Sequence, residues 1–462
     1  QGRGYKTALI GKYLKEYFDI AAYIPPGWTK FVATMRKKKG VWIDYSVVIG
    51  HSTPGKPGRG ETIEDVAQYL TDFERDKAVE FLNEVKNNDA PFFLFFSTHA
   101  PHSPALPAAG DEELFPGYLY RARAYKEADI SDKPEWVQKS LYNEEKEDEF
   151  HLNQLRSLQA VDRAIGAIMD KIEEMGKIND TVFIFTSDNG YIWGEHGLKA
   201  KTKPYDESIR VPLVIVMPGE NMRRGEIEKR LVAANLDIPS TIFELSGKSA
   251  KNDGLSLVPL LRAGVIETVL REAGIETVLR EAGIETVSWR SEFLIEGFGF
   301  NFSLPSWAGI RSEEWKYVEY ANEKQEKEFY NLKEDPLEKH NLFSPSQSFD
   351  SLSEIDIEEI SGRLNRIKGL TMIYTQPPPM KVGEPYEFRF EAWGGKKPYR
   401  WSVFDGRLPK GISLNEKTGV IKGTLKKAER RKISIKVKDS SADTVNRRPQ
   451  SYVARFVLGS VE

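Results

Sequence analysis

The sequence predicts an α/β fold with a mainly parallel central sheet, followed by an all-β domain. Three apolar runs lack polar alternation, as strands buried on both faces do, at Pro91–Ser97, Thr181–Thr186 and Val211–Met217. Segments with helical spacing of apolar residues precede the first two, at Thr62–Lys86 and Phe150–Met175. Helices that alternate with apolar strands favour a parallel sheet covered on both faces.

The composition fits a folded chain of two or three domains. It has 462 residues, of which 40% are hydrophobic and 11% aromatic, so a disordered or collagen-like chain is excluded. No apolar run approaches the roughly 18 residues that a transmembrane helix needs. The sequence contains no cysteine, which excludes disulfides, thiolate metal sites and a cysteine nucleophile.

The remaining segments complete the first predicted domain. Thr7–Tyr17 is compatible with a short helix. Strand patterns at Ala308–Glu319 and Glu328–Leu332 predict a small antiparallel subdomain at its end. We expect this domain to cover residues 1–345.

A linker and a second domain follow. Residues 346–372 are expected to form the linker, with one helix at Glu354–Leu364. Short strand-like segments separated by Gly, Pro, Asn and Asp then recur over residues 373–462, which is typical of an Ig-like β-sandwich.

One repeat interrupts the first domain. The nine residues IETVLREAG occur at Ile266–Gly274 and again at Ile275–Gly283. An interaction helix is one interpretation, but a glycine at every ninth position weakens it. We favour a tandem duplication in a tolerant surface loop, or an artefact of sequencing.

Two clusters of polar residues follow predicted strands. Asp188 and Asn189 come directly after Thr181–Thr186, where the carboxyl end of a strand places ligands in open α/β sheets. Their oxygens suit a hard divalent cation, although taken alone they are explained better by an Asx turn. His99 and His102 follow Pro91–Ser97 and are two of only six histidines; they have either a structural or a functional role.

A lysine-rich loop is the third signal. Lys199, Lys201 and Lys203 lie between Gly194 and Pro212, where they would offer donors to a tetrahedral anion beside the acidic site. The alternative is an ordinary solvated basic loop.

In this order, the motifs resemble those of the sulfatases of the alkaline-phosphatase superfamily. The resemblance extends from Gly4–Leu14 (GYKTALIGKYL), through Tyr23–Trp28, Asp188–Gly190 and Lys201–Pro212, to Glu328–Leu342. Tyr23–Trp28 is similar to the branch of N-acetylglucosamine-6-sulfatases and extracellular endosulfatases. The resemblance implies the sulfatase/alkaline-phosphatase-like α/β sandwich and hydrolysis of sulfate esters on sulfated carbohydrate.

The resemblance also implies roles for individual residues. Asp188 and Asn189 would bind the metal, usually Ca²⁺ with Mg²⁺ as the alternative. Lys12, His102 and Lys201 would contact the sulfate or the leaving oxygen, and His99 and His196 would lie on the substrate side. Lys201 is preferred to its neighbours because it precedes Tyr205 by four residues, as in the family.

The sequence departs from the family pattern in two ways. Leu14 stands where most members have a histidine. The C/S-x-P-x-R motif that yields the family's formylglycine nucleophile is absent, as is the early pair of acidic metal ligands. We expect both in a missing N-terminal segment, so that residues 1–462 alone would be inactive.

Two other functions stay open at this point. A metal-dependent phosphoesterase of the same superfamily is one, but its two-zinc members typically carry Asp-His where this chain has Asp188-Asn189. A non-catalytic protein that binds sulfated glycans is the other. Nothing indicates a nucleic-acid partner.

The C-terminal domain resembles a bacterial Ig-like, cadherin-like module through Leu408–Thr424 (LPKGISLNEKTGVIKGT). The resemblance implies an exported bacterial enzyme, either periplasmic or extracellular. Residues 371–462 hold 19 Lys and Arg against 9 Asp and Glu, or +10, which leaves −13 for residues 1–370. This asymmetry suggests docking of a polyanion, with sugars stacking on aromatic rings, although a spacer is the alternative. The residues expected to dock it are Lys396, Lys397, Arg400 and Lys426–Lys432, with Trp393, Tyr399 and Trp401.

Overall fold

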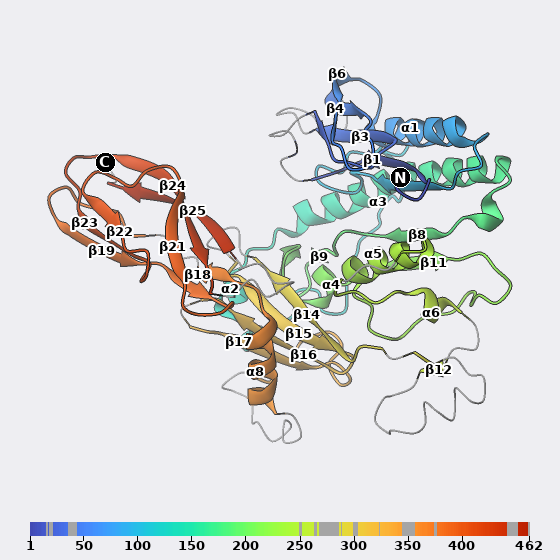
Figure 1. The fold of residues 1–462 in the computed structure, drawn as a ribbon. Coiled ribbons are helices and arrows are strands. Elements are labelled where there is room, and N and C mark those ends of the chain that lie inside the picture. The colour runs from blue at the N-terminus through green and yellow to red at the C-terminus, as the bar shows by residue number, and fades with distance from the viewer. Residues whose placement is uncertain are drawn as a thin grey trace.

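The computed structural model describes two parts of the chain, an α/β part and a smaller all-β part (Figure 1). The described residues are 1–14, 17, 22–35, 44–248, 252–262, 266–267, 286–287, 289–298, 304–322, 324–343, 356–373, 377–440 and 451–460. Most of the repeat at 266–283 therefore lies outside the described residues. Within the described part of the chain, no helix combines the length and apolar character needed to cross a membrane.

The central sheet is mixed, and the expectation of a mainly parallel sheet is corrected here. Its order is β6-β4-β3-β1-β7, with β1 parallel to β3 and β7, and β4 antiparallel to β3 and β6. The connection from Met35 to Tyr45 is too short for the crossover that a parallel neighbour requires. The strands are β1 (Lys6–Gly11), β3 (Lys30–Met35), β4 (Tyr45–Gly50), β6 (Glu61–Val66) and β7 (Phe92–Ser97).

The other two predicted core strands pair with each other. β8 (Phe183–Thr186) is antiparallel to β11 (Leu213–Val216), with Ile184 opposite Ile215. Both strands lie within apolar runs predicted from the sequence, but their relative direction was predicted wrongly. An apolar run predicts burial and not the direction of its neighbour, because parallel and antiparallel partners bury the same side chains.

Two segments expected to be helical contain strands. The segment Thr7–Tyr17 begins as β1, in which Ala8, Leu9 and Ile10 are all buried. Side chains on both faces of this strand are covered, so the sequence shows no alternation. In Thr62–Lys86, only the second part is helix, as α1 (Leu70–Val85), and the first belongs to β6.

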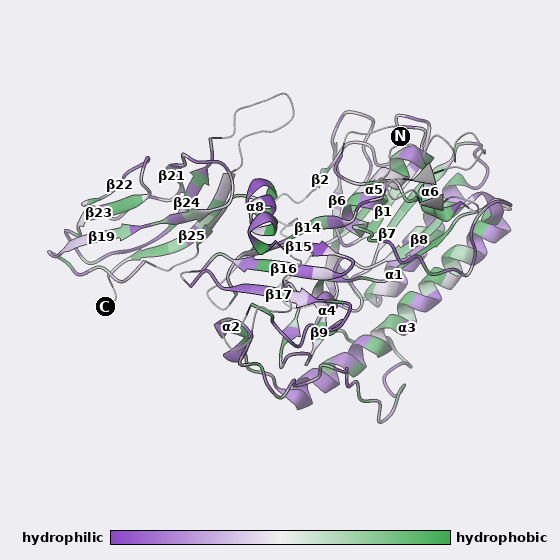
Figure 2. Ribbon diagram, turned by 90° about the horizontal axis from the view of Figure 1, so that it is seen from below, coloured by the Kyte–Doolittle hydropathy of each residue, from purple (hydrophilic) through white to green (hydrophobic). Residues whose placement is uncertain are grey.

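Two long helices cover the central sheet. α1 packs against α3 (Glu144–Glu174), and both contribute to the main apolar core with β1 and β4. Asn143 caps α3 by accepting a hydrogen bond from the backbone N–H of Lys146 at 3.0 Å. Figure 2 shows the alternation of hydrophilic and hydrophobic residues along α3. Ala160, Ala164 and Ile168 lie on its buried side.

The predicted antiparallel subdomain is present as a four-stranded sheet. Its strands are β14 (Glu292–Gly297), β15 (Trp307–Ser312), β16 (Trp315–Tyr320) and β17 (Lys327–Asn331), each antiparallel to the next. Helix α8 (Ile357–Ile367) lies in the predicted linker and packs Ile360 and Leu364 against this sheet.

Shorter elements connect these parts. They are β2 (Tyr23–Ile24), β5 (Gly58–Arg59), α2 (Glu135–Gln138), η2 (Ile178–Asp180), β9 (Ile192–Trp193), β10 (Lys199–Ala200), α4 (Asp206–Ile209), α5 (Ala234–Leu245), α6 (Val258–Leu261), β12 (Ile266–Glu267) and β13 (Thr286–Val287).

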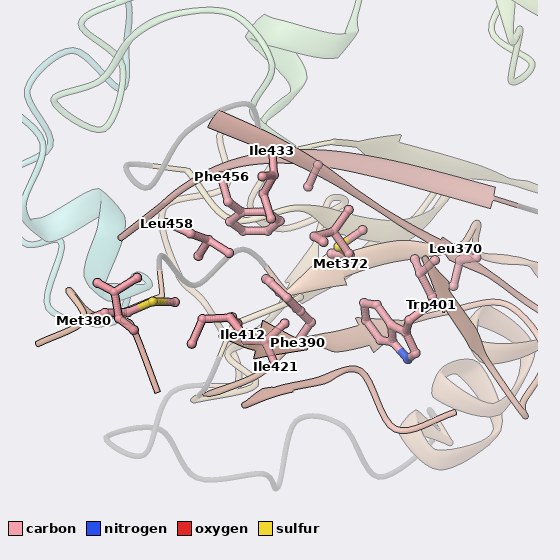
Figure 3. Packing of buried hydrophobic residues seen from close by; sticks show 14 residues of the cluster. Leu370, Met372, Met380, Phe390, Trp401, Ile412, Ile421, Ile433, Phe456 and Leu458 are labelled. Carbon is pink, nitrogen blue, oxygen red and sulfur yellow. The ribbon is translucent and has the colours of Figure 1, made fainter. Parts of the chain in front are cut away.

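The C-terminal part is the predicted β-sandwich. One sheet has the order β21-β24-β25, and the facing strands form the sheets β19-β23-β22 and β18-β20. Apolar side chains from both layers fill the space between them (Figure 3). The strands are β18 (Thr371–Ile373), β19 (Pro385–Arg389), β20 (Glu391–Trp393), β21 (Arg400–Asp405), β22 (Ile412–Leu414), β23 (Val420–Thr424), β24 (Arg430–Lys438) and β25 (Ser451–Gly459).

The aromatic residues expected to stack on sugars are engaged within the protein. Trp401 is only 4% exposed and packs near Phe390 in the sandwich core (Figure 3). The ammonium of Lys368 lies 3.9 Å from the ring centre of Trp393. Tyr399 packs against the core and donates its hydroxyl to the Gly394 carbonyl at 2.8 Å. The burial of Trp401 contradicts its expected stacking role, whereas stacking on the half-buried Trp393 and Tyr399 stays a prediction.

Candidate functional site

The carboxyl ends of β1 and β7 lie side by side and carry the first residues of the site. The Lys12 N–H donates to the Ser97 carbonyl at 2.6 Å, and the Ser97 hydroxyl donates to the Lys12 carbonyl at 2.7 Å. Gly11 has φ +116°, and a Cβ there would lie 2.0 Å from the Ser97 carbonyl oxygen. Only glycine allows this approach, which fixes the backbone from which Lys12 extends.

Residues from three distant segments converge here. Lys12 Nζ lies 2.8 Å from Asp188 Oδ2, and Lys201 Nζ lies 2.9 Å from Asn189 Oδ1. Asp188 and Asn189 follow β8, and Lys201 follows β10. The structure thus brings together two cations, a carboxylate and an amide oxygen that the sequence singled out separately.

The charges of the cluster act on one another. Burial alone would raise the pKa of Asp188, but the bond from Lys12 and the charges of Lys201 and His102 hold that pKa below its ordinary value. Burial lowers the pKa of Lys201, and the charge of Lys12 lowers it further against the opposing effect of Asp188. An excess of positive charge beside a single carboxylate favours a bound anion.

His102 belongs to the same electrostatic cluster. Its Nδ1 lies 2.9 Å from the Ser103 carbonyl oxygen. A carbonyl only accepts, so Nδ1 carries a proton and Nε2 is the nitrogen left for a ligand. Partial burial lowers the pKa of His102, as do the charges of Lys201 and Lys12, against the bond to Ser103.

His99 faces the protein interior. Its Nδ1 lies 3.7 Å from Glu74 Oε1, and the Glu74 side chain is fully buried beneath the end of β1. Thr34 donates to the same carboxyl oxygen at 3.3 Å. Burial raises the pKa of Glu74. Sequence reasoning missed Glu74, although a carboxyl four residues after Leu70 on the apolar side of a helix was a visible signal.

His196 is placed away from the cluster. Its imidazole is fully buried, with Nδ1 2.7 Å from Glu127 Oε2 and its ring centre 4.5 Å from that of Tyr205. In this position the side chain has no surface to offer a carbohydrate, so the expectation of a substrate contact is not supported. His196 itself has a positive φ of 53°.

The neighbours of Lys201 make contacts of a different kind. Lys199 Nζ lies 2.7 Å from Glu147 Oε1 of α3. Lys203 Nζ donates to the Lys199 carbonyl, and burial lowers the pKa of Lys203 to about 8. Of the three lysines of the loop, only Lys201 contacts the polar residues after β8.

A buried polar network fixes the loop that carries Lys201. Tyr205 donates its hydroxyl to Glu328 Oε1 at 2.7 Å, and the Asp206 N–H donates to Glu338 Oε2 at 2.8 Å. Lys316 Nζ donates to the Pro204 carbonyl at 2.7 Å and to Asp206 Oδ1 at 3.1 Å. The late sequence motif at 328–342 therefore supplies carboxylates that anchor this loop to the four-stranded sheet.

The donor set partly fits a hard cation. Asp188 and Asn189 provide a carboxylate and an amide oxygen on adjacent residues, and each already faces a positive group. Across the described ranges, no cluster of three or more His, Cys, Asp or Glu side chains is arranged to hold a metal ion. These two residues therefore fit as part of a Ca²⁺ or Mg²⁺ site, and further ligands are needed to complete it.

Comparisons with known families match the α/β part and the all-β part of the chain separately. Residues 1–248 match the sulfatase family model, and residues 371–455 match the He_PIG model of an Ig domain. The chain is 32% identical over 273 residues to a Caenorhabditis elegans homolog of the extracellular sulfatase Sulf-1, covering 56% of this chain and 36% of that protein.

Other relatives extend over more of the chain. The N-acetylglucosamine-6-sulfatase of Bos taurus is 28% identical over 407 residues, covering 78% of this chain and 65% of that protein. The chain thus spans less than two thirds of either relative. A solved structure described as a complex with its substrate D-glucosamine-2-N,6-O-disulfate superposes with a TM-score of 0.56 at 21% identity, covering 79% of each chain. This likeness shows the alkaline-phosphatase-like fold of the sulfatases.

Proposed function

Because this chain belongs to the sulfatase family, whose model matches residues 1–248, we propose that it takes part in the hydrolysis of sulfate esters on sulfated carbohydrate. One observation carries the proposal: Lys12, Lys201 and Asp188 meet where β1, β10 and β8 end. An anionic sulfate group needs cationic donors, and a leaving alkoxide needs a proton.

Each residue of the cluster has a proposed role. Lys12 and Lys201 bind sulfate oxygens in a partly desolvated position, where their charges act strongly. His102 presents Nε2 to the leaving oxygen. Because a bound anion offsets the charges of Lys12 and Lys201, it raises the pKa of His102 and favours the protonated imidazole that can donate.

Asp188 and Asn189 would hold a hard cation, for which Ca²⁺ is the first choice and Mg²⁺ the second. When bound, such an ion supplies positive charge that steadies the oxygens of the sulfate group. We propose that the remaining ligands, and a formylglycine nucleophile, come from residues outside 1–462. The sequence has no cysteine and no S-x-P-x-R motif from which this chain would form that nucleophile.

The two alternatives differ from this proposal at identifiable points. A two-zinc phosphoesterase would use an imidazole where Asn189 supplies an amide oxygen, and amide oxygens suit calcium or magnesium better. A non-catalytic glycan-binding protein would keep the two lysines but gain nothing from a proton donor at His102.

We also propose a place and a partner for the whole protein. Two relatives are named extracellular sulfatases, which supports a periplasmic or extracellular location. The +10 charge of residues 371–462 supports a second contact with the polyanionic substrate.

Sulfate release tests the proposed function. Protein that carries residues 1–462 together with a formylglycine-bearing segment should hydrolyse N-acetylglucosamine 6-sulfate in the presence of Ca²⁺, whereas residues 1–462 alone should not. Lys201→Ala should abolish turnover, and the matched variant Lys199→Ala should retain it. Faster hydrolysis of the phosphate ester, or turnover that requires zinc, would assign the phosphoesterase function instead.

A further inference from the structure

We propose that a single face of the C-terminal sandwich docks a linear sulfated polysaccharide. This basic face consists of the outward side chains of the sheet β21-β24-β25, namely Arg400, Lys432, Lys436, Lys438 and Arg455. The choice of a sulfated glycan as the occupant rests on the proposed function, since the adjoining domain would act on sulfate esters.

Charge is divided unequally between the two layers of the sandwich. The three strands β21, β24 and β25 contain seven Lys and Arg residues and one acidic residue, Asp405. The five strands of the other layer contain two basic and two acidic residues, and there Glu387 is opposite Lys422. The strands of one layer are thus nearly neutralised while those of the other are strongly cationic.

Strand alternation directs these cations outward. Ile433, Ile435 and Val437 of β24 are buried in the core, so Lys432, Lys436 and Lys438 point to the opposite side. In β25, Ala454 and Phe456 are buried, and Arg455 between them is exposed. Residues two apart on a strand are separated by about 6.8 Å, and neighbouring strands by about 4.8 Å, so the charges form a compact array.

The array places like charges next to each other. Arg400 of β21 is directly opposite Lys438 of β24, and such a pair destabilises a sheet. Lys436 lies over the ring of Phe404, with its ammonium 5.5 Å from the ring centre, and Phe404 is 62% exposed. Among the residues that the structure describes, no carboxylate pairs with Arg400, Lys432, Lys436 or Lys438. A bound polyanion would relieve this repulsion.

This face differs from the surface expected from the sequence. Within the Lys426–Lys432 cluster, Arg431 is paired with Glu429 at 2.8 Å, which reduces its charge toward a ligand. The aromatic residues named with that cluster are engaged inside the protein, as described above. The face we propose therefore shares Arg400 and Lys432 with the expected surface and otherwise consists of outward side chains of β24 and β25, and the contact is electrostatic.

Retention on immobilised heparin tests the inference, using the whole 462-residue chain. At low ionic strength the chain should bind, and added salt should release it because screening weakens exposed charges. In Lys436→Gln/Lys438→Gln, the protein concentration that half-saturates the heparin should rise on the order of tenfold, because two cations that face the anionic surface are lost. The matched control Arg389→Gln/Lys422→Gln removes the same charge from the other layer and should bind like the wild type.

The outcomes separate docking from catalysis. Equal weakening by both double variants would show a response to net charge alone and overturn the assignment of this face. Equally tight binding of double-stranded DNA, or of N- and O-desulfated heparin, would overturn the assignment to sulfated glycans. In the complete enzyme, Lys436→Gln/Lys438→Gln should weaken retention on heparin and leave sulfate release from N-acetylglucosamine 6-sulfate unchanged, because both residues lie in β24, outside the proposed sulfate site. Unweakened retention in this variant would overturn only this inference, and absence of sulfate release from the complete wild-type enzyme would overturn only the proposed function.

Discussion

Lys12 Nζ and Asp188 Oδ2 lie 2.8 Å apart, although 176 residues separate them in the sequence. One follows β1 of the mixed central sheet and the other follows β8, which pairs only with β11 among the described strands. Their contact joins the ends of two separate sheets at one point. We propose this contact as the centre of the sulfate site.

Asp188→Ala should leave the fold intact and remove activity from the complete enzyme. The ion pair is exposed, with Asp188 63% exposed, and such pairs contribute about 0–1 kcal/mol to stability. Loss of a metal ligand should reduce sulfate release by a factor on the order of 10² or more. Asp180→Ala, at the other end of β8, is the control. Normal turnover and unchanged Ca²⁺ affinity in Asp188→Ala would reject the metal assignment.

Lys201→Ala should affect turnover far more than Lys199→Ala. Lys201 contacts Asn189, whereas Lys199 is bound to Glu147 of α3. A lysine in a partly desolvated site acts strongly on a transferring group, whereas the charge of Lys199 is already paired with the buried carboxylate of Glu147. Sulfate release at saturating substrate compares the two variants. Similar small losses in both would show that the loop is an ordinary basic surface.

His102 should titrate below its ordinary pKa of 6.5 in the free chain. Partial burial and the charges of Lys201 and Lys12 favour the neutral imidazole, so folding releases protons and stability falls as the pH drops below about 6.5. NMR titration of the imidazole signals, assigned with His102→Gln, measures this pKa. Saturating inorganic sulfate should raise it. A pKa of 6.5 or above without sulfate would contradict the electrostatic assignment.

Tyr320→Phe should destabilise the α/β part through one lost hydrogen bond. The Tyr320 hydroxyl donates to Glu328 Oε2 at 2.5 Å, and both residues are almost fully buried. Removing one donor from a buried carboxyl costs about 1–3 kcal/mol of unfolding free energy. Chemical denaturation measures the change, with the exposed Tyr118→Phe as the control. Equal stability of the two variants would count against a structural role for the network.

Trp401→Ala should destabilise the sandwich by about 3–5 kcal/mol, because it deletes a large core side chain. Val382→Ala, at an exposed position of the same domain, should change stability by less than about 0.5 kcal/mol. Thermal unfolding of both variants gives the comparison. If Trp401→Ala were neutral in stability but reduced glycan binding, the stacking role expected from the sequence would be restored.

The sequence by itself determined the class of fold and singled out the residues of the candidate site, whose roles stay predictions. Apolar runs located β7, β8 and β11. The polar residues that follow two of these runs are His99 and His102 after β7, and Asp188 and Asn189 after β8. This succeeds because burial selects apolar side chains wherever a strand crosses the core, and because the ends of such strands are where polar groups can meet a ligand.

Only the tertiary structure decided which of these residues meet and which way the strands run. Direction within the sheet was undetermined because both orientations bury the same apolar side chains. His196 and Trp401 carried site-like chemistry in the sequence, yet their backbone positions direct them inward. The contacts of Glu74 with His99 and of Glu328 with Tyr205 join distant segments of the chain, so only the tertiary structure shows them.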